Sequence, residues 1–370
     1  MADVIVVGGG IAGCAAALEL AMRGARVTLL EAEQPGVRAT GASAGMLAPQ
    51  YEAGGPDPAF MLGIRARAEY GAFVRVVEEL AEWRVGYRQH GMLVANRSEA
   101  ESSHARASLE WQAELGLRGT ILSPEEALAL HPGLSPEVPS WQWLQDEAQV
   151  DAQRLAVALG PAVQAAGGRL KLGEAVTEIV AGGGRVSGVR TASGDVHAAD
   201  AVVLAAGAWC GGIAGLPRRL PVRPVRGQIL RLHPAAVPGW PLVATHDARY
   251  LVPRENGTVL VGSTMEDVGF DDTVTDEARL LLAEHAAALV PSLANAPIIE
   301  RWAGLRPLTP DGWPILGPEP LLPGLFYATG HGRNGILLGP LSGRVVADLV
   351  LQGSSDVPWQ PLRADRFPVP

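Results

Sequence analysis

Apolar and polar positions along the chain predict strands and helices that alternate at first. Further along, helices and strands are grouped into separate stretches of the sequence. A short apolar run at Asp3–Val7 ends in glycines, an alanine-rich helical stretch follows at 11–23, and a second apolar run at 26–30 ends in Glu31. Strand, glycine turn, helix and strand form a βαβ unit, whose parallel strands need cover on both faces. A 3.6-residue apolar period then predicts a long helix at 58–82.

The middle of the chain changes from helical to β patterns. Further helices are predicted at 99–115, 151–166 and Pro124–Leu130, the last opened by Ser123 as N-cap and Pro124 at the first helical position. Short β runs separated by turns follow at 170–172, 175–180, 186–191, 196–198, 201–205, 228–232, 250–252 and 258–262. A helix at 273–289, a buried strand at 325–328 and a closing helix at 335–351 complete the pattern.

Composition narrows the class of protein. A chain of 370 residues is long for one core, so two domains are expected. The formal charge of −9 disfavours a nucleic-acid or anionic-membrane partner. Cys14 and Cys210 belong to no CxxC or Cys/His cluster, which argues against a disulfide framework and a zinc site. The start of the chain does not read as a signal peptide, and glycines interrupt the weakly polar stretch 201–217, so we expect a soluble, cytoplasmic protein.

A nucleotide-binding fingerprint lies in the first βαβ unit. Gly8, Gly10 and Gly13 satisfy GxGxxG in the context that the motif requires, after a strand and at the start of a helix. These glycines permit a tight turn and close approach of a pyrophosphate to the helix N-terminus. Glu31 follows Gly13 by eighteen residues and can accept hydrogen bonds from ribose hydroxyls. The alternative is a generic glycine-rich turn with a surface glutamate.

A second glycine-rich turn favours FAD over NAD. A nicotinamide dehydrogenase normally continues with more strand–helix units, whereas this chain becomes β-rich and returns to strand, glycine turn and helix only at 325–336. Two such turns suit a cofactor with two ends, one at the pyrophosphate and one near the flavin ring, where a helix N-terminus favours the anionic reduced form. The alternative for this segment is a glycine-containing loop before a terminal helix.

Five motifs together resemble a known family. They are the amino-terminal fingerprint, Ala-Ser-Ala-Gly-Met-Leu-Ala-Pro at 42–49, Trp-Ala-Gly-Leu-Arg-Pro at 302–307, Asp-Gly-Trp-Pro-Ile-Leu-Gly at 311–317 and Gly-His-Gly-Arg-Asn-Gly-Ile at 330–336. They resemble the D-amino-acid-oxidase superfamily of flavoproteins, and within it the glycine oxidases of the thiamine pathway. Gly332 departs from that pattern, where a larger aromatic residue is expected. This difference puts the width of the site and the choice of substrate in doubt.

The resemblance implies an α/β fold. A Rossmann-type βαβ domain for FAD would be interleaved with an α+β substrate domain on a largely antiparallel sheet. The FAD-binding domain would comprise residues 1–80, 146–218 and 306–370, and the substrate domain residues 81–145 and 219–305. The resemblance also implies a homotetramer.

Site residues are carried over position by position. The resemblance implies that substrate would meet Arg306, which pairs with its carboxylate, together with Tyr250, Arg333, Met265 and Met46. It implies non-covalent FAD, since no cysteine follows Cys210. The implied cofactor contacts are Gly8, Gly10, Ile11, Ala12, Gly13, Glu31, Ala32, Ala39, Thr40, Ala44, Gly45, Met46, Val176, Gly207, Gly330, His331, Gly332, Arg333, Asn334, Gly335, Ile336 and Leu337.

The residue types agree with amine oxidation but leave alternatives open. An arginine can bind a carboxylate through two hydrogen bonds, and Arg306 has no acidic neighbour in sequence that would occupy it. The competing interpretation is a salt bridge to a distant acidic residue. Tyr250 also fits a packing role, and Arg333 also fits a role in lining the flavin turn. His331 in a glycine turn suits backbone contact, so no side-chain base is predicted. Hydride transfer from substrate Cα to flavin N5 needs mainly orientation and exclusion of water.

Three functions follow from this sequence. The first is an oxidase of glycine, sarcosine or small D-amino acids, which would give an imine, then glyoxylate and ammonia in the case of glycine, and hydrogen peroxide from dioxygen. The second is a dehydrogenase of D-amino acids or proline-type substrates that passes electrons to a quinone or a carrier protein. The third is a non-catalytic FAD-binding subunit of a larger oxidase. The first best accommodates Arg306 and Tyr250.

Overall fold

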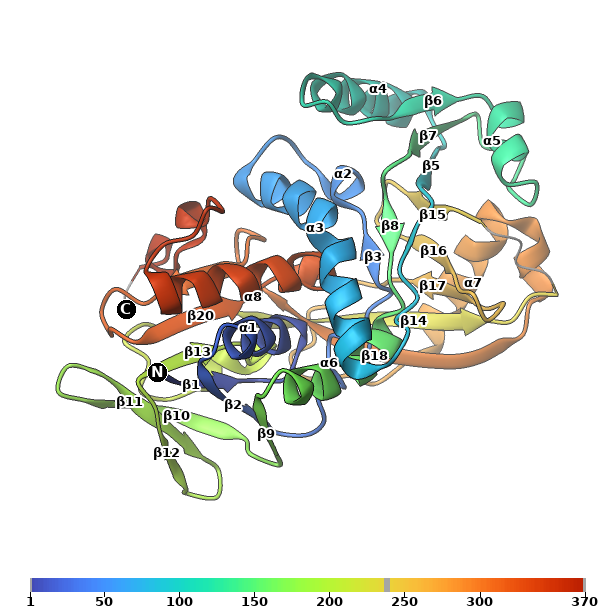
Figure 1. The fold of residues 1–370 in the computed structure, drawn as a ribbon. Helices are drawn as coiled ribbons and strands as arrows, with labels where there is room; N and C mark the ends of the chain where they lie inside the picture. The colour runs from blue at the N-terminus through green and yellow to red at the C-terminus, as the bar shows by residue number, and fades with distance from the viewer. Residues whose placement is uncertain (1, 236–239, 369–370) are drawn as a thin grey trace.

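A six-stranded sheet forms the centre of the part of the fold that contains both described chain ends (Figure 1). The computed structural model describes residues 2–235 and 240–368. The sheet has the order β19-β20-β13-β1-β2-β9, in which β19 is antiparallel to its neighbour and the other five strands run parallel. Its strands are β1 (Asp3–Val7), β2 (Arg26–Glu31), β9 (Arg169–Leu172), β13 (Ala201–Leu204), β19 (Ile315–Pro318) and β20 (Leu325–Thr329).

Both faces of this sheet are covered, as the apolar sequence of β1 requires. Val4 and Val6 point into a core shared with helices α1 (Ile11–Met22), α6 (Ala152–Ala165) and α8 (Gly335–Gln352). The alternate residues Ile5 and Val7 point into a second core beneath a three-stranded antiparallel sheet. That small sheet consists of β10 (Val176–Gly182), β11 (Arg185–Thr191) and β12 (Val196–Ala198).

Helices α1 and α8 lie against one another over the central sheet (Figure 1). Small residues allow the close approach, because a Cβ added at Gly339 would lie 2.7 Å from Ile11 Cγ2 and one at Gly343 would lie 2.5 Å from the Ala16 backbone nitrogen. The stretch Gly332–Gln352 is the one described helix long and apolar enough to cross a membrane, and 72% of its apolar window is buried. Its packing against α1 explains the apolar composition, which is that of a core helix.

An eight-stranded sheet forms the second part of the fold, with the order β18-β14-β17-β16-β15-β5-β7-β6. Neighbouring strands are antiparallel except β15 and β5. Helix α7 (Asp276–Leu289) packs on one face, and the opposite face carries Tyr250 and Val252. The strands are β5 (Met92–Asn96), β6 (Thr120–Leu122), β7 (Ser140–Leu144), β14 (Arg223–Leu232), β15 (Leu242–Thr245), β16 (Tyr250–Pro253), β17 (Val259–Gly262) and β18 (Ile298–Leu308).

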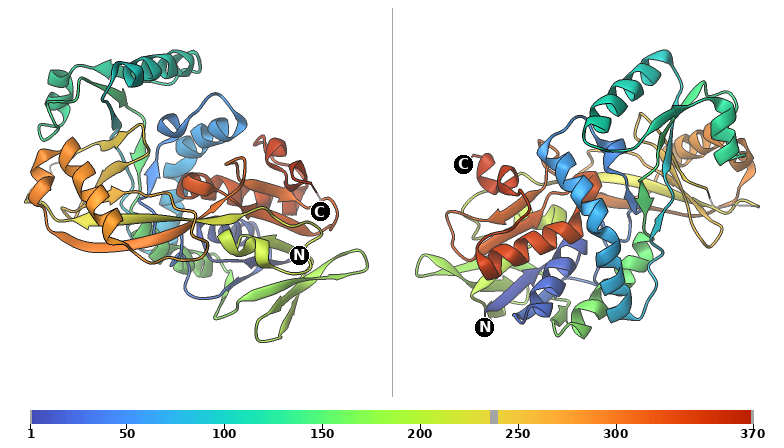
Figure 2. Two further views of the ribbon diagram at one scale, coloured as in Figure 1. Left: turned by 180° about the vertical axis from the view of Figure 1, so that it is seen from behind. Right: turned by 45° about the horizontal axis from the view of Figure 1, so that its top comes forward.

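The remaining helices and short strands lie around the two large sheets (Figure 2). The long helix α3 (Pro58–Ala81) contacts both α6 and α8, and helices α4 (Glu99–Glu114) and α5 (Pro124–Leu130) contact strands at the far edge of the eight-stranded sheet. The remaining elements are α2 (Pro49–Glu52), the small sheet of β3 (Met46–Leu47), β4 (Arg88–Gln89) and β8 (Ala148–Gln149), and the 3₁₀ turns η1 (Gly207–Gly212), η2 (Pro291–Asn295), η3 (Gly332–Asn334), η4 (Gln360–Leu362) and η5 (Ala364–Arg366).

The structure confirms the predicted fold class and most of the predicted elements. The βαβ unit is present, Asp151 caps α6, and Ser123 forms a full capping box with Glu126 at α5. The stretch 201–217 is a strand followed by a turn, as its glycines indicate. Sequence patterns did not predict β18, the edge strand of the large sheet. Its eleven residues mix arginine, glutamate, glycine and proline and show no two-residue alternation.

Candidate functional site

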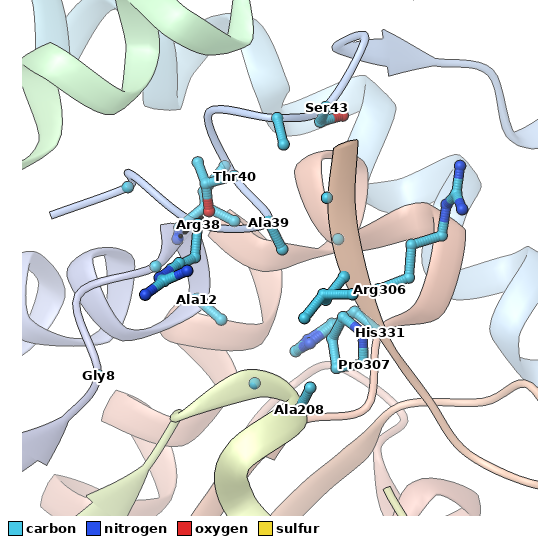
Figure 3. Close-up of a pocket in the computed structure, with 18 of the residues that line it drawn as sticks. Gly8, Ala12, Arg38, Ala39, Thr40, Ser43, Ala208, Arg306, Pro307 and His331 are labelled. Atoms are coloured by element: carbon cyan, nitrogen blue, oxygen red, sulfur yellow. Dashed lines mark hydrogen bonds between the residues drawn. The ribbon is translucent and has the colours of Figure 1, made fainter. Parts of the chain in front are cut away.

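A cavity of about 530 Å³ runs between the six-stranded sheet and the face of the eight-stranded sheet that carries Tyr250. Figure 3 shows part of it, with the segment containing Arg38 to Ser43 on one side and Arg306, Pro307 and His331 on another. Most of the predicted site residues line it: Gly8, Gly10, Ile11, Ala12, Glu31, Ala32, Ala39, Thr40, Ala44, Gly45, Met46, Val176, Gly207, Tyr250, Arg306, His331, Gly332, Arg333, Asn334, Gly335 and Ile336.

The glycine-rich turn after β1 is shaped for close approach of a ligand to the backbone. Gly8 has a φ of +100°, and a Cβ there would lie 2.6 Å from the Ala205 carbonyl oxygen. A Cβ at Gly13 would lie 2.0 Å from the Gly8 carbonyl oxygen, so the third glycine permits helix–strand packing. Helix α1 begins at the cavity after its N-cap Gly10. Its N-terminus therefore directs backbone N–H groups and partial positive charge at the site of a pyrophosphate.

Glu31 lies at the end of β2 and lines the same end of the cavity. Its Oε2 atom accepts a hydrogen bond from the Gly9 backbone nitrogen at 2.6 Å, and its Oε1 atom accepts one from the Glu33 nitrogen at 2.9 Å. Each carboxylate oxygen has a second lone pair, so Glu31 can also accept hydrogen bonds from ribose hydroxyls. The turn, the helix N-terminus and this carboxylate together fit the adenosine diphosphate half of FAD.

The segment 39–46 borders the middle of the cavity and is held by side chains of the eight-stranded sheet. Trp302 Nε1 donates to the Ala42 carbonyl oxygen at 3.0 Å, and Arg254 Nη2 donates to the Ala44 carbonyl oxygen at 2.7 Å. Gly45 has a φ of +72°, and a Cβ there would lie 1.9 Å from the Val150 carbonyl oxygen. These contacts hold the backbone of segment 39–46 in place beside the cavity.

Arg254 was not among the predicted site residues. Burial lowers its pKa to about 10, a shift that the nearby Asp151 carboxylate opposes. Its hydrogen bonds go to the neutral acceptors Ala44 O, Gln149 Oε1 and Val150 O. In the sequence, Arg254 is visible only as an arginine directly after the apolar strand β16. Its hydrogen-bond partners lie more than a hundred positions away, so no local pattern indicates its role.

The second glycine-rich turn forms the opposite wall. His331, at the start of η3, is buried, and its Nε2 atom lies 2.9 Å from Ser342 Oγ. Burial lowers the pKa of His331 to about 4, so the imidazole is neutral at neutral pH. Gly332 has a φ of +55°, and a Cβ there would lie 3.1 Å from Leu308 Cδ1. In this chain the turn uses the backbone freedom of glycine and packs against β18.

Arg306 projects from β18 into the cavity beside Gly227 of β14. A Cβ at Gly227 would lie 2.1 Å from Arg306 Nη1, so the missing side chain leaves the space that the guanidinium occupies. Arg306 donates to the Thr264 carbonyl oxygen at 3.2 Å and to Ser263 Oγ at 2.7 Å. Burial lowers the pKa of Arg306, and Tyr250 opposes this shift. The two neutral acceptors orient the cation and leave its charge available to a carboxylate.

Tyr250 is positioned in the same way. It pairs with Gly262 across β16 and β17, and a Cβ at Gly262 would lie 2.5 Å from the tyrosine ring. The ring therefore lies over the strand and contributes to the cavity lining near Arg306. Two strand glycines, neither of them predicted as a site residue, thus make room for the two side chains predicted to bind substrate.

Glu52 is a further charged residue of the cavity that sequence reasoning missed. It ends the short helix α2, and its Oε1 atom accepts a hydrogen bond from Arg333 Nη2 at 2.7 Å. Burial lowers the pKa of Arg333, but the Glu52 carboxylate, with smaller effects of Tyr51 and Tyr250, more than offsets it, and the net shift is upward. The segment 49–58 contains Gly54, Gly55 and three prolines, and its shape could not be derived from sequence.

Four predicted residues lie outside the cavity lining: Gly13, Met265, Gly330 and Leu337. Gly13 and Gly330 sit in tight packing against Gly8 and Thr309, and Leu337 is buried in the helical core. The Met265 side chain is 51% exposed. Its neighbours Thr264 and Glu266 turn inward and contact one another and Gln228, and the alternation of an extended chain directs Met265 the other way.

Comparison with known proteins agrees with this geometry. The family model described as FAD dependent oxidoreductase (DAO) matches residues 3–349. The chain is 37% identical to a glycine oxidase from Pseudomonas aeruginosa, over 94% of each protein. It is 39% identical, over 96% of its length, to the bifunctional protein ThiO/ThiG from Nostoc sp., and it spans 53% of that longer protein.

A solved structure also matches. The crystal structure of glycine oxidase from Geobacillus kaustophilus superimposes with a TM-score of 0.93 and 33% sequence identity, covering 100% of both chains. Family model, sequence relatives and structure agree over nearly the whole chain. The protein is therefore a member of the DAO family of FAD dependent oxidoreductases and belongs to its glycine oxidase branch.

Proposed function

We propose that the protein oxidises glycine and other small amino acids or amines at the C–N bond. The observation that carries the proposal is Arg306, a cation held by neutral acceptors in the cavity that also contains the glycine-rich turn after β1. A guanidinium in such a site is matched to a carboxylate, and the cavity supplies a nucleotide site next to it. Glycine is the leading substrate, with sarcosine and small D-amino acids as further candidates.

FAD is the cofactor, and the lining residues named above are proposed to hold it without a covalent bond. The helix α1 N-terminus and Glu31 would hold its adenosine end, and the backbone of segment 39–46 and of turn η3 would border its ring. Both cysteines, Cys14 and Cys210, are buried, and the Cys210 thiol donates a hydrogen bond to Thr329 Oγ1. Their environments are those of packing residues in the core. When bound, FAD supplies the two-electron acceptor for a hydride from the substrate Cα.

The side chains serve to bind and orient. Arg306 would pair with the substrate carboxylate, Tyr250 would add a hydrogen bond to it, and Arg333 would lie beside the substrate. Met46 is proposed to border the same space. No side-chain base is proposed: His331 is neutral, and its Nε2 atom is engaged by Ser342. The amine must bind in its neutral form, and a bound substrate would displace water from the cavity.

The overall reaction would consume glycine, water and dioxygen and produce glyoxylate, ammonia and hydrogen peroxide. Two electrons and two protons leave glycine to give the imine, water hydrolyses the imine, and dioxygen takes up the two electrons and two protons. A dehydrogenase that reduces a quinone or a carrier protein is the second candidate. A non-catalytic FAD-binding subunit is the third, and the orientation of Arg306 argues against it.

The cellular setting is proposed on the same basis. The ThiO/ThiG relatives support a role in making the glycine imine for the thiazole of thiamine. A cytoplasmic location and a homotetramer are part of the proposal. So is the division into an FAD-binding domain of residues 1–80, 146–218 and 306–370 and a substrate domain of residues 81–145 and 219–305. The two separate large sheets support a division of this kind, although the boundary at 305/306 falls inside β18.

Steady-state turnover with product analysis tests the function. Purified protein with FAD is supplied with glycine, sarcosine, D-alanine and D-proline in air, and glyoxylate or the corresponding oxo acid, ammonia and hydrogen peroxide are measured. We expect equal amounts of the three products from glycine. Rapid reduction of an artificial dye with little peroxide would instead favour the dehydrogenase, and a yellow protein that forms no product from any of these compounds would refute both.

A further inference from the structure

The charged residues that line the cavity fall into two groups. Glu31, Glu33, Arg38 and Glu174 lie at the nucleotide end. Glu52, Arg306 and Arg333 line the cavity together with Tyr250 at the end predicted to receive substrate. In this second group two cations face one anion, and the formal charge of the described groups there is +1. The two arginines differ in how the charge around them is balanced.

Glu52 is held in place by contacts outside the cavity. The Glu147 carboxylate accepts hydrogen bonds from the backbone nitrogens of Gln50 at 2.7 Å and Tyr51 at 3.2 Å, and it pairs with Arg67 at 2.7 Å. The Tyr51 hydroxyl donates to the Thr245 carbonyl oxygen at 2.8 Å. Helix α2 is therefore fastened through Gln50 and Tyr51, the two residues before Glu52, to Glu147 next to β8 and to β15 of the eight-stranded sheet. The position of the Glu52 carboxylate is set before any ligand binds.

This placement makes the two arginines different. Arg333 forms an ion pair with Glu52 at 2.7 Å, whereas Arg306 donates to a hydroxyl and a carbonyl oxygen and is attracted by Glu52 only over a longer distance. Arg306 can thus receive one carboxylate, while Arg333 has its charge already balanced. A second acidic group on the substrate would meet Glu52 beside Arg333, and like charges in a partly desolvated site are strongly unfavourable.

We propose that Glu52 sets the charge class of the substrate, so that the site accepts amines that carry one carboxylate and rejects those that carry a second acid. This inference rests on the proposed function for its substrates, but the underlying charge arrangement can be measured with unreactive anions. It assigns to Glu52 a specificity role that its position in a short helix does not reveal. Such selection by an unfavourable charge is a recognised route to discrimination.

The test compares iminodiacetate with glycine. Iminodiacetate is glycine with a second carboxymethyl group on its nitrogen. We expect Glu52→Gln to raise the ratio of kcat/KM for iminodiacetate to that for glycine by about tenfold or more, because the second carboxylate gains Arg333 and loses a repelling neighbour. Glu52→Asp, which keeps the charge, should retain most of the wild-type preference. The double variant Glu52→Gln/Arg333→Met should lose the gain.

Glu69→Gln is the matched control. It removes one carboxylate from an ion pair with Arg65 on α3, away from the cavity lining, and should leave the ratio within about twofold of wild type, since exposed pairs contribute little. An unchanged ratio in Glu52→Gln, with glycine oxidation intact, would overturn the inference and leave the proposed function standing. An equal rise in Glu69→Gln would also overturn it.

A binding measurement on the wild-type protein covers the case in which a variant does not fold. Acetate and malonate are titrated against the FAD-loaded protein, and their dissociation constants are read from the change in the visible flavin spectrum. We expect malonate to bind no more tightly than acetate. Malonate binding tighter by about tenfold or more would show that Arg333 receives a second carboxylate, contrary to the inference. If wild type oxidises neither amine, the proposed function fails, and this pair of constants alone decides the charge claim.

Discussion

Replacing Arg306 by methionine tests the substrate site most selectively. A guanidinium has five N–H donors, and Arg306 uses two of them on Ser263 Oγ and the Thr264 carbonyl oxygen. Three donors remain, and a substrate carboxylate can engage two. Hydrogen bonds to charged groups are worth about 1.5–3 kcal/mol each, so their loss costs about 3–6 kcal/mol. At about 1.4 kcal/mol per factor of ten, we expect kcat/KM for glycine to fall by about two to four orders of magnitude.

The assay is initial-rate peroxide or glyoxylate formation across a range of glycine concentrations, with retained FAD measured from the visible spectrum. Most of the loss should be in KM, because the arginine binds the carboxylate before and during reaction. Arg301→Met removes an arginine from the same strand that pairs with Asp276 on the surface, and it should leave both constants near wild type. An unchanged KM for glycine in Arg306→Met, with FAD still bound, would refute the assignment.

Three further predictions concern the rest of the site. Gly227→Ala places a Cβ 2.1 Å from Arg306 Nη1 and should raise KM for glycine by about tenfold or more while FAD binding is retained; an unchanged KM would show that Arg306 does not need that space. Glu31→Gln halves the acceptor capacity at the ribose position and should weaken FAD binding, measured by ultrafiltration, with KM for glycine nearly unchanged in the FAD-saturated protein; unaltered FAD affinity would contradict this. His331 has a folded pKa of about 4, below its ordinary value of 6.5, so it contributes stability above pH 6.5 that is lost as the pH falls toward 4. The fall in Tm over that range should be shallower in His331→Gln, and an equally steep fall would contradict the buried neutral imidazole.

Local signals in the sequence were sufficient for much of the fold. The βαβ unit is encoded within about thirty residues, and its glycines, apolar strands and alanine-rich helix each point to the same structure. The capping box at Ser123 and Glu126 is likewise a contact over three positions. The family motifs then indicated the second glycine turn and Arg306, both of which line the cavity.

The features that were missed depend on contacts between distant positions. Glu52 faces the cavity because Glu147 anchors α2 from a position 97 residues after Gln50. Gly227 and Gly262 matter only because strand pairing brings each against a large side chain of another strand. Strand β18 has no clear alternation because it is an edge strand: its first four residues are exposed, and most of the others are half-buried. No local pattern contains this information.

The most direct test of the account is anaerobic mixing of the FAD-loaded protein with glycine while the visible flavin absorbance is followed. The account predicts that the absorbance is lost in a single turnover at a rate that saturates with glycine, and that it returns when dioxygen is admitted. A flavin that stays oxidised with excess glycine, sarcosine and D-alanine would contradict the central claim that Arg306 presents a small amino acid to FAD.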